Sequence, residues 1–397
     1  MIKIQISKTL QGKIRKGCPW VFKYQVQNQV PEEKSENLGI IYDHNNRFLA
    51  LGLWDPRSDL CFRVMVLGKP REINADFFQE RLLSAKAMRE PLESQGTTGY
   101  RVINGENDGF PGLVLDRYED ALVIKLYTTS WFPFLELLSE LFCKEFNSKK
   151  LVLRLAKNIS KSCGSKLVYQ DGQFLYGSKE SSWIEFKENG LKFIADVVEG
   201  QKTGFFLDQR ENRFKIHKMA KDRSVLNVFS YTGGFSVYAF AGGCKSVVEI
   251  DSSPQALENS KRNLKLNFPD QSFSPPRLLQ EAGDAFQILA RMKSENLSFD
   301  LVVLDPPAFA RNKKQKAQAL EAYVRLIKAG AQLTSEILYA ASCTRHVKAN
   351  EFYDAACLGI RSAGKKYEEI FKTGHALDHP VTFPEAFYLK SACFKIH

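Results

Sequence analysis

The pattern of apolar and polar positions changes character along the chain. In the first part, short alternating runs bounded by Gly, Pro and Asn predict strands at residues 1–7, 48–54 and 61–66. A basic, turn-rich stretch at 12–20 is predicted as a loop between them. We therefore expect a small β-rich domain over residues 1–70.

The middle of the chain mixes both periodicities. Apolar residues at helical spacing predict helices over 75–89 and 134–146, and alternating runs predict strands at 99–104, 112–116 and 121–127. Further strands and a polar loop follow from residue 151. This pattern favours a central α+β domain over residues 71–190.

From residue 191 onward, strands and helices alternate. Apolar runs predict strands at 224–229, 246–250, 300–304, 337–342, 368–372 and 386–395. Helices are predicted between them at 234–241, 253–266, 284–292, 314–333 and 351–362. Ser253 before Pro254 is typical of a helix start. We expect an α/β domain over 191–397 with a mostly parallel, doubly wound, Rossmann-like sheet.

Composition excludes several classes of protein. Hydrophobic residues make up 44% of the 397 residues, and no apolar run approaches the ~20 residues that a membrane helix requires. The N-terminus lacks the apolar segment of a signal peptide. The eight cysteines are scattered, without Cys-x-x-Cys or metal-ligand spacing. We expect a cytoplasmic protein with free thiols, no metal site and no membrane partner.

The net charge of +11 indicates an anionic partner, most simply nucleic acid. Residues 1–31 contain no acidic side chain. Three basic stretches stand out, and a solvated surface is the alternative for each. Their members are Lys3, Lys8, Lys13, Arg15, Lys16 and Lys23; Lys149, Lys150, Arg154, Lys157, Lys161 and Lys166; and Arg311, Lys313, Lys314 and Lys316.

The loop after the strand at 224–229 is a candidate ligand site. It reads Phe229-Ser230-Tyr231-Thr232-Gly233-Gly234. Paired glycines allow a sharp turn and close approach to a ligand, and the following helix N-terminus offers N–H groups to an anion. The loop is neither a G-x-G-x-x-G dinucleotide motif nor a phosphate-binding Walker loop.

Two acids follow the next strands. Asp251, beside Ser252, comes roughly 20 residues after the glycine loop, a spacing typical of a ribose-binding acid. Asp284 precedes a helix and is placed to meet an adenine amino group. A simple helix cap is the alternative for both acids.

The stretch Asp305-Pro306-Pro307-Ala308-Phe309 follows the predicted strand at 300–304. Two prolines make the backbone stiff and extended. Ligands bind at the carboxyl ends of strands in open α/β sheets. An acid, free carbonyls and an aromatic ring in a stiff loop favour binding of a flat heterocycle.

These ordered motifs resemble those of class I S-adenosylmethionine-dependent methyltransferases. The run Lys202-Thr203-Gly204-Phe205-Phe206-Leu207-Asp208-Gln209-Arg210 narrows the resemblance to bacterial 23S rRNA 5-methylcytosine methyltransferases of the RlmI-like group. Residues 16–22 resemble the start of that group's RNA-binding PUA domain, and 99–118 its central domain.

The resemblance implies a cofactor, a partner and site residues. The cofactor is S-adenosyl-L-methionine, held by Phe229, Ser230, Tyr231, Gly233, Asp251, Ser252, Asp284 and Arg210. The partner is RNA, with 23S rRNA expected. We expect the RNA to contact two sets of residues. They are Lys13, Arg15 and Lys16 of the PUA-like domain, and Pro306, Pro307 and Phe309 beside the base. The oligomeric state stays open, a homodimer included.

Cys343 carries the expected chemistry. It follows the strand at 337–342, beside the Asp305 strand. Cytosine C5 is a poor nucleophile, but addition of a thiolate to C6 converts the ring into an enamine that can attack a methyl group. The thiolate is the reactive form, so the adjoining Arg345 and His346 are of interest.

The other cysteines are expected to be small structural residues. They are Cys18, Cys61, Cys143, Cys163, Cys244, Cys357 and Cys393.

Asp305 is expected to form a hydrogen bond to cytosine N3 or to protonate it. Phe309 is expected to stack on the base, and the alternative is that Phe309 is an ordinary core residue. Better-known RNA cytosine methyltransferases carry a second cysteine in the loop occupied here by Pro306, Pro307 and Ala308. The group that removes the C5 proton is therefore unidentified.

Two other functions stay open. An exocyclic-amine methyltransferase, acting on guanine or adenine, would use the Asp305 loop without a cysteine. A non-catalytic RNA-binding assembly factor would retain only the cofactor fold.

Overall fold

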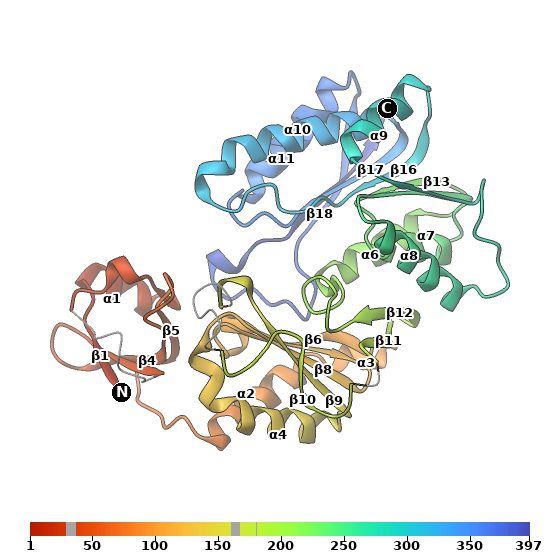
Figure 1. The fold of residues 1–397 in the computed structure, drawn as a ribbon. Helices are drawn as coiled ribbons and strands as arrows, with labels where there is room; N and C mark the ends of the chain where they lie inside the picture. The colour runs from red at the N-terminus through yellow and green to blue at the C-terminus, as the bar shows by residue number, and fades with distance from the viewer. Residues whose placement is uncertain (29–36, 160–166, 180) are drawn as a thin grey trace. The chain divides into compact units, whose positions relative to one another are not determined.

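The computed structural model describes residues 1–28, 37–159, 167–179 and 181–397 (Figure 1). Lys161, Cys163 and Lys166 lie outside the described residues. The chain divides into two compact units. Unit 1 comprises 1–190, 194–207 and 377–383, and unit 2 comprises 191–193, 208–376 and 384–397. The predicted domain boundary at residue 70 stays a prediction.

Unit 1 begins with a five-stranded sheet in the order β1-β3-β4-β5-β2. The strands are β1 (Ile2–Ile4), β2 (Trp20–Val21), β3 (Leu38–Tyr42), β4 (Phe48–Trp54) and β5 (Phe62–Leu67). β1 runs parallel to β3, and the other pairs are antiparallel. A small apolar core supports the sheet and includes Ile4, Ile14, Val21 and Phe62.

The predicted loop at 12–20 is wrong over its first part, because helix α1 (Lys8–Arg15) occupies it. The side chain of Ser7 accepts a hydrogen bond from the amide of Leu10 and caps the helix. Leu10 and Ile14, four residues apart, are buried on one face. This face stabilises the helix despite Gly12 in its interior.

A second five-stranded sheet of unit 1 has the order β10-β9-β8-β7-β6. Its strands are β6 (Gly99–Asn104), β7 (Leu113–Tyr118), β8 (Ala121–Leu126), β9 (Lys150–Leu155) and β10 (Gln173–Tyr176). Helices α2 (Ala75–Ala87), α3 (Glu90–Ser94) and α4 (Leu135–Phe146) accompany it, and β11 (Trp183–Glu188) pairs with β12 (Leu191–Asp196). The α+β character expected for this region is observed.

Buried side chains fix the second sheet and its helices. Trp131 is fully buried and donates its indole N–H to the carbonyl of Pro111 at 2.9 Å. Arg89 is also buried, and its guanidinium donates two hydrogen bonds to Asp108 at 2.8 and 2.6 Å. The same guanidinium donates to the carbonyl of Asp378 at 3.1 Å, which attaches segment 377–383 to unit 1.

Unit 2 contains a seven-stranded sheet in the order β15-β14-β13-β16-β17-β19-β18. The strands are β13 (Ser224–Val228), β14 (Ser246–Asp251), β15 (Leu278–Ala282), β16 (Phe299–Leu304), β17 (Thr334–Ser342), β18 (Tyr367–Thr373) and β19 (Lys390–Ile396). The first five in the order are parallel neighbours, and β19 is antiparallel to both β17 and β18. Apolar residues at both faces explain the continuous Leu/Val runs.

Two groups of helices flank this sheet (Figure 1). α6 (Arg210–Met219), α7 (Gly234–Ala241) and α8 (Pro254–Asn267) form one group, and α9 (Ala285–Ser294), α10 (Lys316–Gln332) and α11 (Ala349–Ser362) form the other. Ser253 caps α8 through the amide of Ala256, as its position before Pro254 predicted. The doubly wound α/β fold predicted from the alternation is confirmed.

The predicted strand at 386–395 is wrong over 386–389. A 3₁₀ turn at Pro384–Ala386 precedes β19. The amides of Tyr388 and Leu389 donate to Nε2 of His375 at 3.0 and 2.9 Å instead of to a neighbouring strand. Hydrogen bonds to a side-chain acceptor thus replace the strand-to-strand hydrogen bonds at these two residues.

Strands β3 and β15 and helix α6 were not predicted. β15 has a half-exposed pattern with Gln280 and Glu281 in it, which hides the strand periodicity. In the described part of the chain, no helix is long and apolar enough to cross a membrane, and no cluster of metal-binding side chains is found.

Candidate cofactor and catalytic site

The candidate residues of unit 2 follow neighbouring strands of one parallel sheet. Asp284 comes after β15, Asp251 ends β14, Phe229 follows β13, Asp305 follows β16 and Cys343 follows β17. Cα pairing places Val228 opposite both Ile250 and Leu304, and Leu304 opposite Ala340. The five loops therefore lie side by side at the carboxyl edge of the sheet, where α/β proteins bind ligands.

The loop after β13 makes an unusually tight turn. Phe229, Tyr231 and Gly233 all have left-handed backbone conformations, with φ of 62°, 49° and 74°. Non-glycine residues rarely adopt this region, and such strain concentrates at functional sites. A Cβ at Gly233 would lie 1.9 Å from Oγ of Ser260, so only glycine fits there.

A buried acid on the neighbouring strand stabilises this turn. Glu249 on β14 is fully buried and accepts hydrogen bonds from Oγ of Ser260 and from Nε2 of Gln280, the latter at 2.7 Å. Burial raises the pKa of the Glu249 carboxyl, although these hydrogen bonds partly oppose the shift. Glu249 thus holds Ser260 against Gly233 and fixes the turn.

Asp251 links the glycine loop to α8. One carboxylate oxygen accepts from the amide of Tyr231 and the other from the amide of Ser253, both at 2.9 Å. A carboxylate has about four acceptor sites, so acceptor capacity remains for ribose hydroxyls. The helix-cap alternative is partly correct, since Asp251 orders the start of α8. Ser252 beside it is exposed.

The glycine loop also carries buried polar atoms that suit a ligand. The hydroxyls of Ser230 and Thr232 are more than nine-tenths buried, and neither has a hydrogen-bond partner among the described residues. Buried polar groups are normally paired. Two such hydroxyls beside a turn that excludes a side chain fit an adenosyl cofactor with many polar groups.

Two other predicted cofactor residues have structural partners. Asp284 caps α9 by accepting from the amide of Gln287 at 3.0 Å, and it is exposed. Arg210 is buried at the start of α6 and pairs with Glu211 at 2.9 Å. Their roles toward the cofactor stay predictions.

Asp305 is held by a side chain from another segment. Nε2 of Gln209 donates to its carboxylate at 2.9 Å, and Oε1 of Gln209 accepts from Nδ2 of Asn212 at 2.6 Å. The hydroxyl of Thr373 extends this series of hydrogen bonds by donating to Oδ1 of Asn212 at 2.6 Å. This relay fixes the orientation of the carboxylate.

The loop after Asp305 is partly buried. Pro306 is buried and Pro307 is exposed. The ring of Phe309 is half-buried and lies 4.9 Å from that of Tyr323, between ring centres. Phe309 therefore packs against the unit 2 core, and its stacking on a base stays a prediction.

Cys343 lies next to this loop. Its sulfur is 4.0 Å from the carbonyl oxygen of Pro306, and the side chain is half-buried. The structure thus brings together the two predicted catalytic residues, on the ends of adjacent strands. Of the two predicted neighbouring cations, Arg345 is exposed and His346 is half-buried.

Lys390 supplies a cation that the sequence did not reveal. It is fully buried on β19, with Ser342 as its Cα partner on β17. Its ammonium donates to the carbonyls of Thr344, Val347 and Tyr388, at 2.7 Å for Val347. Burial lowers the pKa of Lys390 to about 8, and the charge of Cys343 opposes that shift. The ammonium thus holds the loop that carries Cys343 in place through these hydrogen bonds.

Sequence reasoning missed Gln209, Glu249 and Lys390 as site residues. Gln209 stands in the run 202–210 quoted for the family resemblance, and Glu249 is an acid inside the predicted strand at 246–250. A polar residue in either place was the available signal. Lys390 had no such signal, because only strand pairing brings it to Cys343.

The predicted RNA contacts Lys13, Arg15 and Lys16 belong to unit 1. All three are exposed at the end of α1. Arg15 forms an ion pair with Asp43 at 2.8 Å. An exposed basic helix end is suited to phosphate contact, and that role stays a prediction.

Comparison with known proteins decides the family. Residues 4–66 match a PUA-like domain, and residues 168–334 match an S-adenosylmethionine-dependent methyltransferase family. A ribosomal RNA large subunit methyltransferase from Deinococcus radiodurans is 42% identical over 98% of this chain and 96% of its own length. The chain belongs to the ribosomal RNA large subunit methyltransferase family.

Two further relatives agree with this family. Ribosomal RNA large subunit methyltransferase I from Shewanella denitrificans is 33% identical over 100% of this chain and 99% of its own length. A solved Streptococcus mutans protein, classed as SAM-dependent, covers 100% of both chains with a TM-score of 0.83 and 21% identity, which shows a shared fold. The resemblance drawn from the sequence motifs is confirmed, and the cofactor is S-adenosylmethionine.

Proposed function

We propose that this protein methylates carbon 5 of a cytosine in large-subunit ribosomal RNA, with Cys343 as the nucleophile. The observation that carries the proposal is the position of the Cys343 sulfur, 4.0 Å from the Pro306 carbonyl of the Asp305 loop. A thiol and a carboxylate on adjacent strand ends are the two groups that this chemistry needs.

The reaction starts from the thiolate of Cys343. Its sulfur adds to C6. The electron pair of the C5–C6 double bond moves to the C4–C5 bond, and that of the C4–N3 double bond moves to N3, where Asp305 stabilises the charge. S-adenosylmethionine supplies a methyl group bonded to a positively charged sulfur. C5 then forms its new bond to that methyl carbon while the methyl–sulfur bond breaks, and its electron pair stays on the sulfur of the departing thioether, S-adenosylhomocysteine. Loss of the C5 proton to a base and breaking of the C6–S bond restore the aromatic ring and the thiolate.

The structure also suits the substrate. The relatives from D. radiodurans and S. denitrificans are named as large-subunit ribosomal RNA methyltransferases. The PUA-like region and the net charge of +11 suit binding to the phosphates of RNA. A base inside a helix must leave its stack to reach Cys343.

Analysis of the methylated nucleoside tests the proposal. Large-subunit RNA is incubated with the protein and isotope-labelled S-adenosylmethionine, digested to nucleosides and separated by mass spectrometry. We expect the label in 5-methylcytidine. Label in N-methylated guanosine or adenosine would instead support the exocyclic-amine methyltransferase, which the Asp305-Pro306-Pro307 loop also fits. Absence of label in every substrate form would support a non-catalytic assembly factor.

Lys390 is expected to set the reactivity of Cys343. A positive charge stabilises a thiolate, so Lys390→Met should raise the pKa of the Cys343 thiol. One pKa unit corresponds to ~10-fold less thiolate at neutral pH. The advantage of wild type over the variant should shrink as pH rises through about 8, where Lys390 loses its proton.

The rate of Cys343 alkylation by iodoacetamide, followed by peptide mass spectrometry from pH 6 to 10, measures this effect. Lys390→Arg keeps a cation and should retain much of the reactivity, and Lys395→Met, at an exposed position of the same strand, is the control. Cofactor binding reports that each variant is folded. A pH profile of Lys390→Met identical to wild type would show that Lys390 has no electrostatic role.

A further inference from the structure

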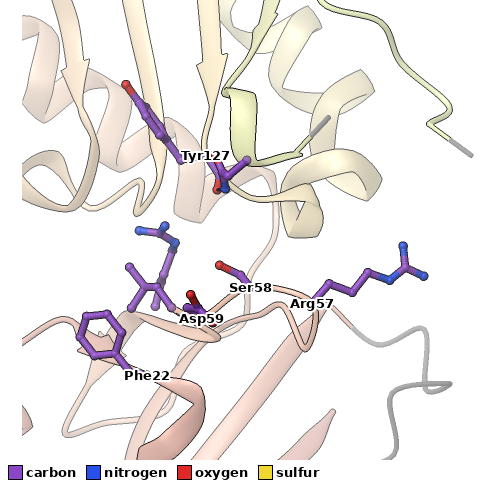
Figure 2. A pocket seen from close by; sticks show the side chains of 8 residues that line it. Phe22, Arg57, Ser58, Asp59 and Tyr127 are labelled. Carbon is purple, nitrogen blue, oxygen red and sulfur yellow. Dashed lines mark hydrogen bonds between the residues drawn. The ribbon is translucent and has the colours of Figure 1, made fainter. Parts of the chain in front are cut away.

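A cavity of about 450 Å³ lies within unit 1, and none of the predicted site residues is among those that line it. Its walls come from distant parts of the chain: Phe22, the turn that carries Arg57 and Asp59, and Tyr127 with Asn158. Figure 2 shows Phe22, Arg57, Ser58 and Asp59 on one side and Tyr127 on the other. Its volume lies in the range typical of sites for small organic ligands.

Hydrogen bonds between distant segments hold the two sides of this cavity together. Trp20 and Arg63, from the first sheet, both donate to the carboxylate of Glu106 at 2.7 Å. Ser130 donates to the carbonyl of Trp54 at 2.6 Å, where both groups are buried. The cavity is therefore a feature of a fixed interface and not a gap between loosely packed loops.

Phe22 of the cavity wall belongs to an aromatic pair whose other member, Tyr24, lies beside the wall and not in it. The rings of Phe22 and Tyr24 are stacked, 5.9 Å between centres and 20° between planes. Tyr24 is 83% exposed, the largest fraction among the exposed large hydrophobic side chains described. A ring held by a neighbour and open to solvent is a platform on which a nucleic acid base can stack.

The polar groups around this pair suit a nucleotide. Arg57 is an exposed cation of the cavity wall, and the exposed Lys23 and Lys157 are chain neighbours of Phe22 and Asn158. The wall also includes Asp59, whose carboxylate can accept from a base amino group. Arg63 is nearly buried in its pair with Glu106, and Arg57, Lys23 and Lys157 are the cations here whose side chains reach solvent, where a phosphate would lie.

We propose that Phe22, Tyr24, Arg57, Asp59, Tyr127 and Asn158 form a binding site for one unpaired nucleotide of single-stranded RNA. We call these residues the aromatic cleft. The base stacks on Tyr24, and Arg57 meets the adjoining phosphate. This inference rests on RNA being the substrate, as proposed above, but not on which atom is methylated.

The choice of RNA follows from the charge and the aromatic content. A peptide ligand would use the exposed ring equally well, but it has no need of the surrounding cations. Arg57, Lys23 and Lys157 are exposed around a cleft with one acidic side chain in its wall. A polyanion with flat bases satisfies both features at once.

Binding of fluorescent RNA, followed by anisotropy, tests the aromatic cleft. The probes are a single-stranded seven-nucleotide RNA of mixed sequence and a blunt duplex containing the same strand. Tyr24→Ala should weaken single-strand binding about 10-fold, since loss of one stacked base has an effect of that order. Duplex binding should change little. Arg57→Gln should weaken binding and reduce the slope of log affinity against log salt by about 1.

Matched controls come from the same unit. Tyr176→Ala removes another exposed ring, 54% exposed on β10, and Arg47→Gln removes an exposed cation from the β3–β4 turn. Both should bind like wild type. Binding is measured without S-adenosylmethionine, so the result does not depend on which atom of the base is methylated.

Three results would each overturn the aromatic cleft. They are wild-type affinity in Tyr24→Ala, an equal loss in Tyr176→Ala, and failure of the wild-type protein to prefer the single strand. Tyr24 and Arg57 are exposed, so loss of folding is not expected from either variant. Unchanged thermal unfolding confirms that a loss of affinity reflects the cleft.

Discussion

Cys343→Ala is expected to lose methyl transfer by at least ~10³-fold while binding S-adenosylmethionine like wild type. The thiol makes the covalent bond that activates the ring, so no other group replaces it. The side chain is half-buried at the end of β17, and alanine fills most of its space. The fold and the cofactor site on β13 and β14 should therefore be retained.

Transfer of a tritiated methyl group to large-subunit RNA measures this loss, and calorimetry measures cofactor binding. Cys357→Ala is the matched control, because Cys357 is also half-buried but lies on α11. It should keep full activity. Activity of Cys343→Ala within ~10-fold of wild type would rule out the thiolate mechanism and favour the amine methyltransferase.

Asp305→Asn is expected to reduce methyl transfer by ~10²–10³-fold, with little change in cofactor affinity. Asparagine keeps the shape and can still accept the hydrogen bond from Gln209, but it has neither the charge nor the acid proton of the carboxyl group. The loss should appear in kcat, because the contact with N3 strengthens as charge develops on the ring.

The control for this change is Asp300→Asn, at the opposite end of the same strand, where Asp300 accepts from Ser224. Gln209→Met should cause a smaller loss of activity than Asp305→Asn, since it only frees the orientation of the carboxylate. If Asp305→Asn changed the Kd for S-adenosylmethionine and left kcat intact, the carboxylate would belong to the cofactor site instead.

Much of this site could be predicted from the sequence, because parallel strands bring their ends together. The runs that became β13, β14, β16 and β17 are mostly apolar, and a candidate residue stands at or directly after the end of each. Once those runs are taken as one parallel sheet, Asp251, Asp305 and Cys343 must share an edge. The structure places all three there.

What the sequence could not provide depends on contacts between distant segments. Gln209 reaches Asp305 across 96 residues, and Lys390 reaches Thr344 across 46. No local periodicity encodes such pairs. Helix α1 was missed because Gly12 and Gly17 suggested turns, whereas burial of Leu10 and Ile14 decides its conformation. The open ring of Tyr24 is likewise a property of tertiary packing.

Large-subunit RNA carrying 5-fluorocytidine tests the central claim most directly. Fluorine at C5 cannot leave as a proton, so the methylated ring stays bonded to the attacking sulfur. We predict a denaturant-resistant complex of wild-type protein and RNA that forms only with S-adenosylmethionine. Peptide mass spectrometry should show that the RNA is bonded to Cys343. Cys343→Ala should form none. An active wild-type protein that forms no complex, or a complex that persists in Cys343→Ala, would contradict the account.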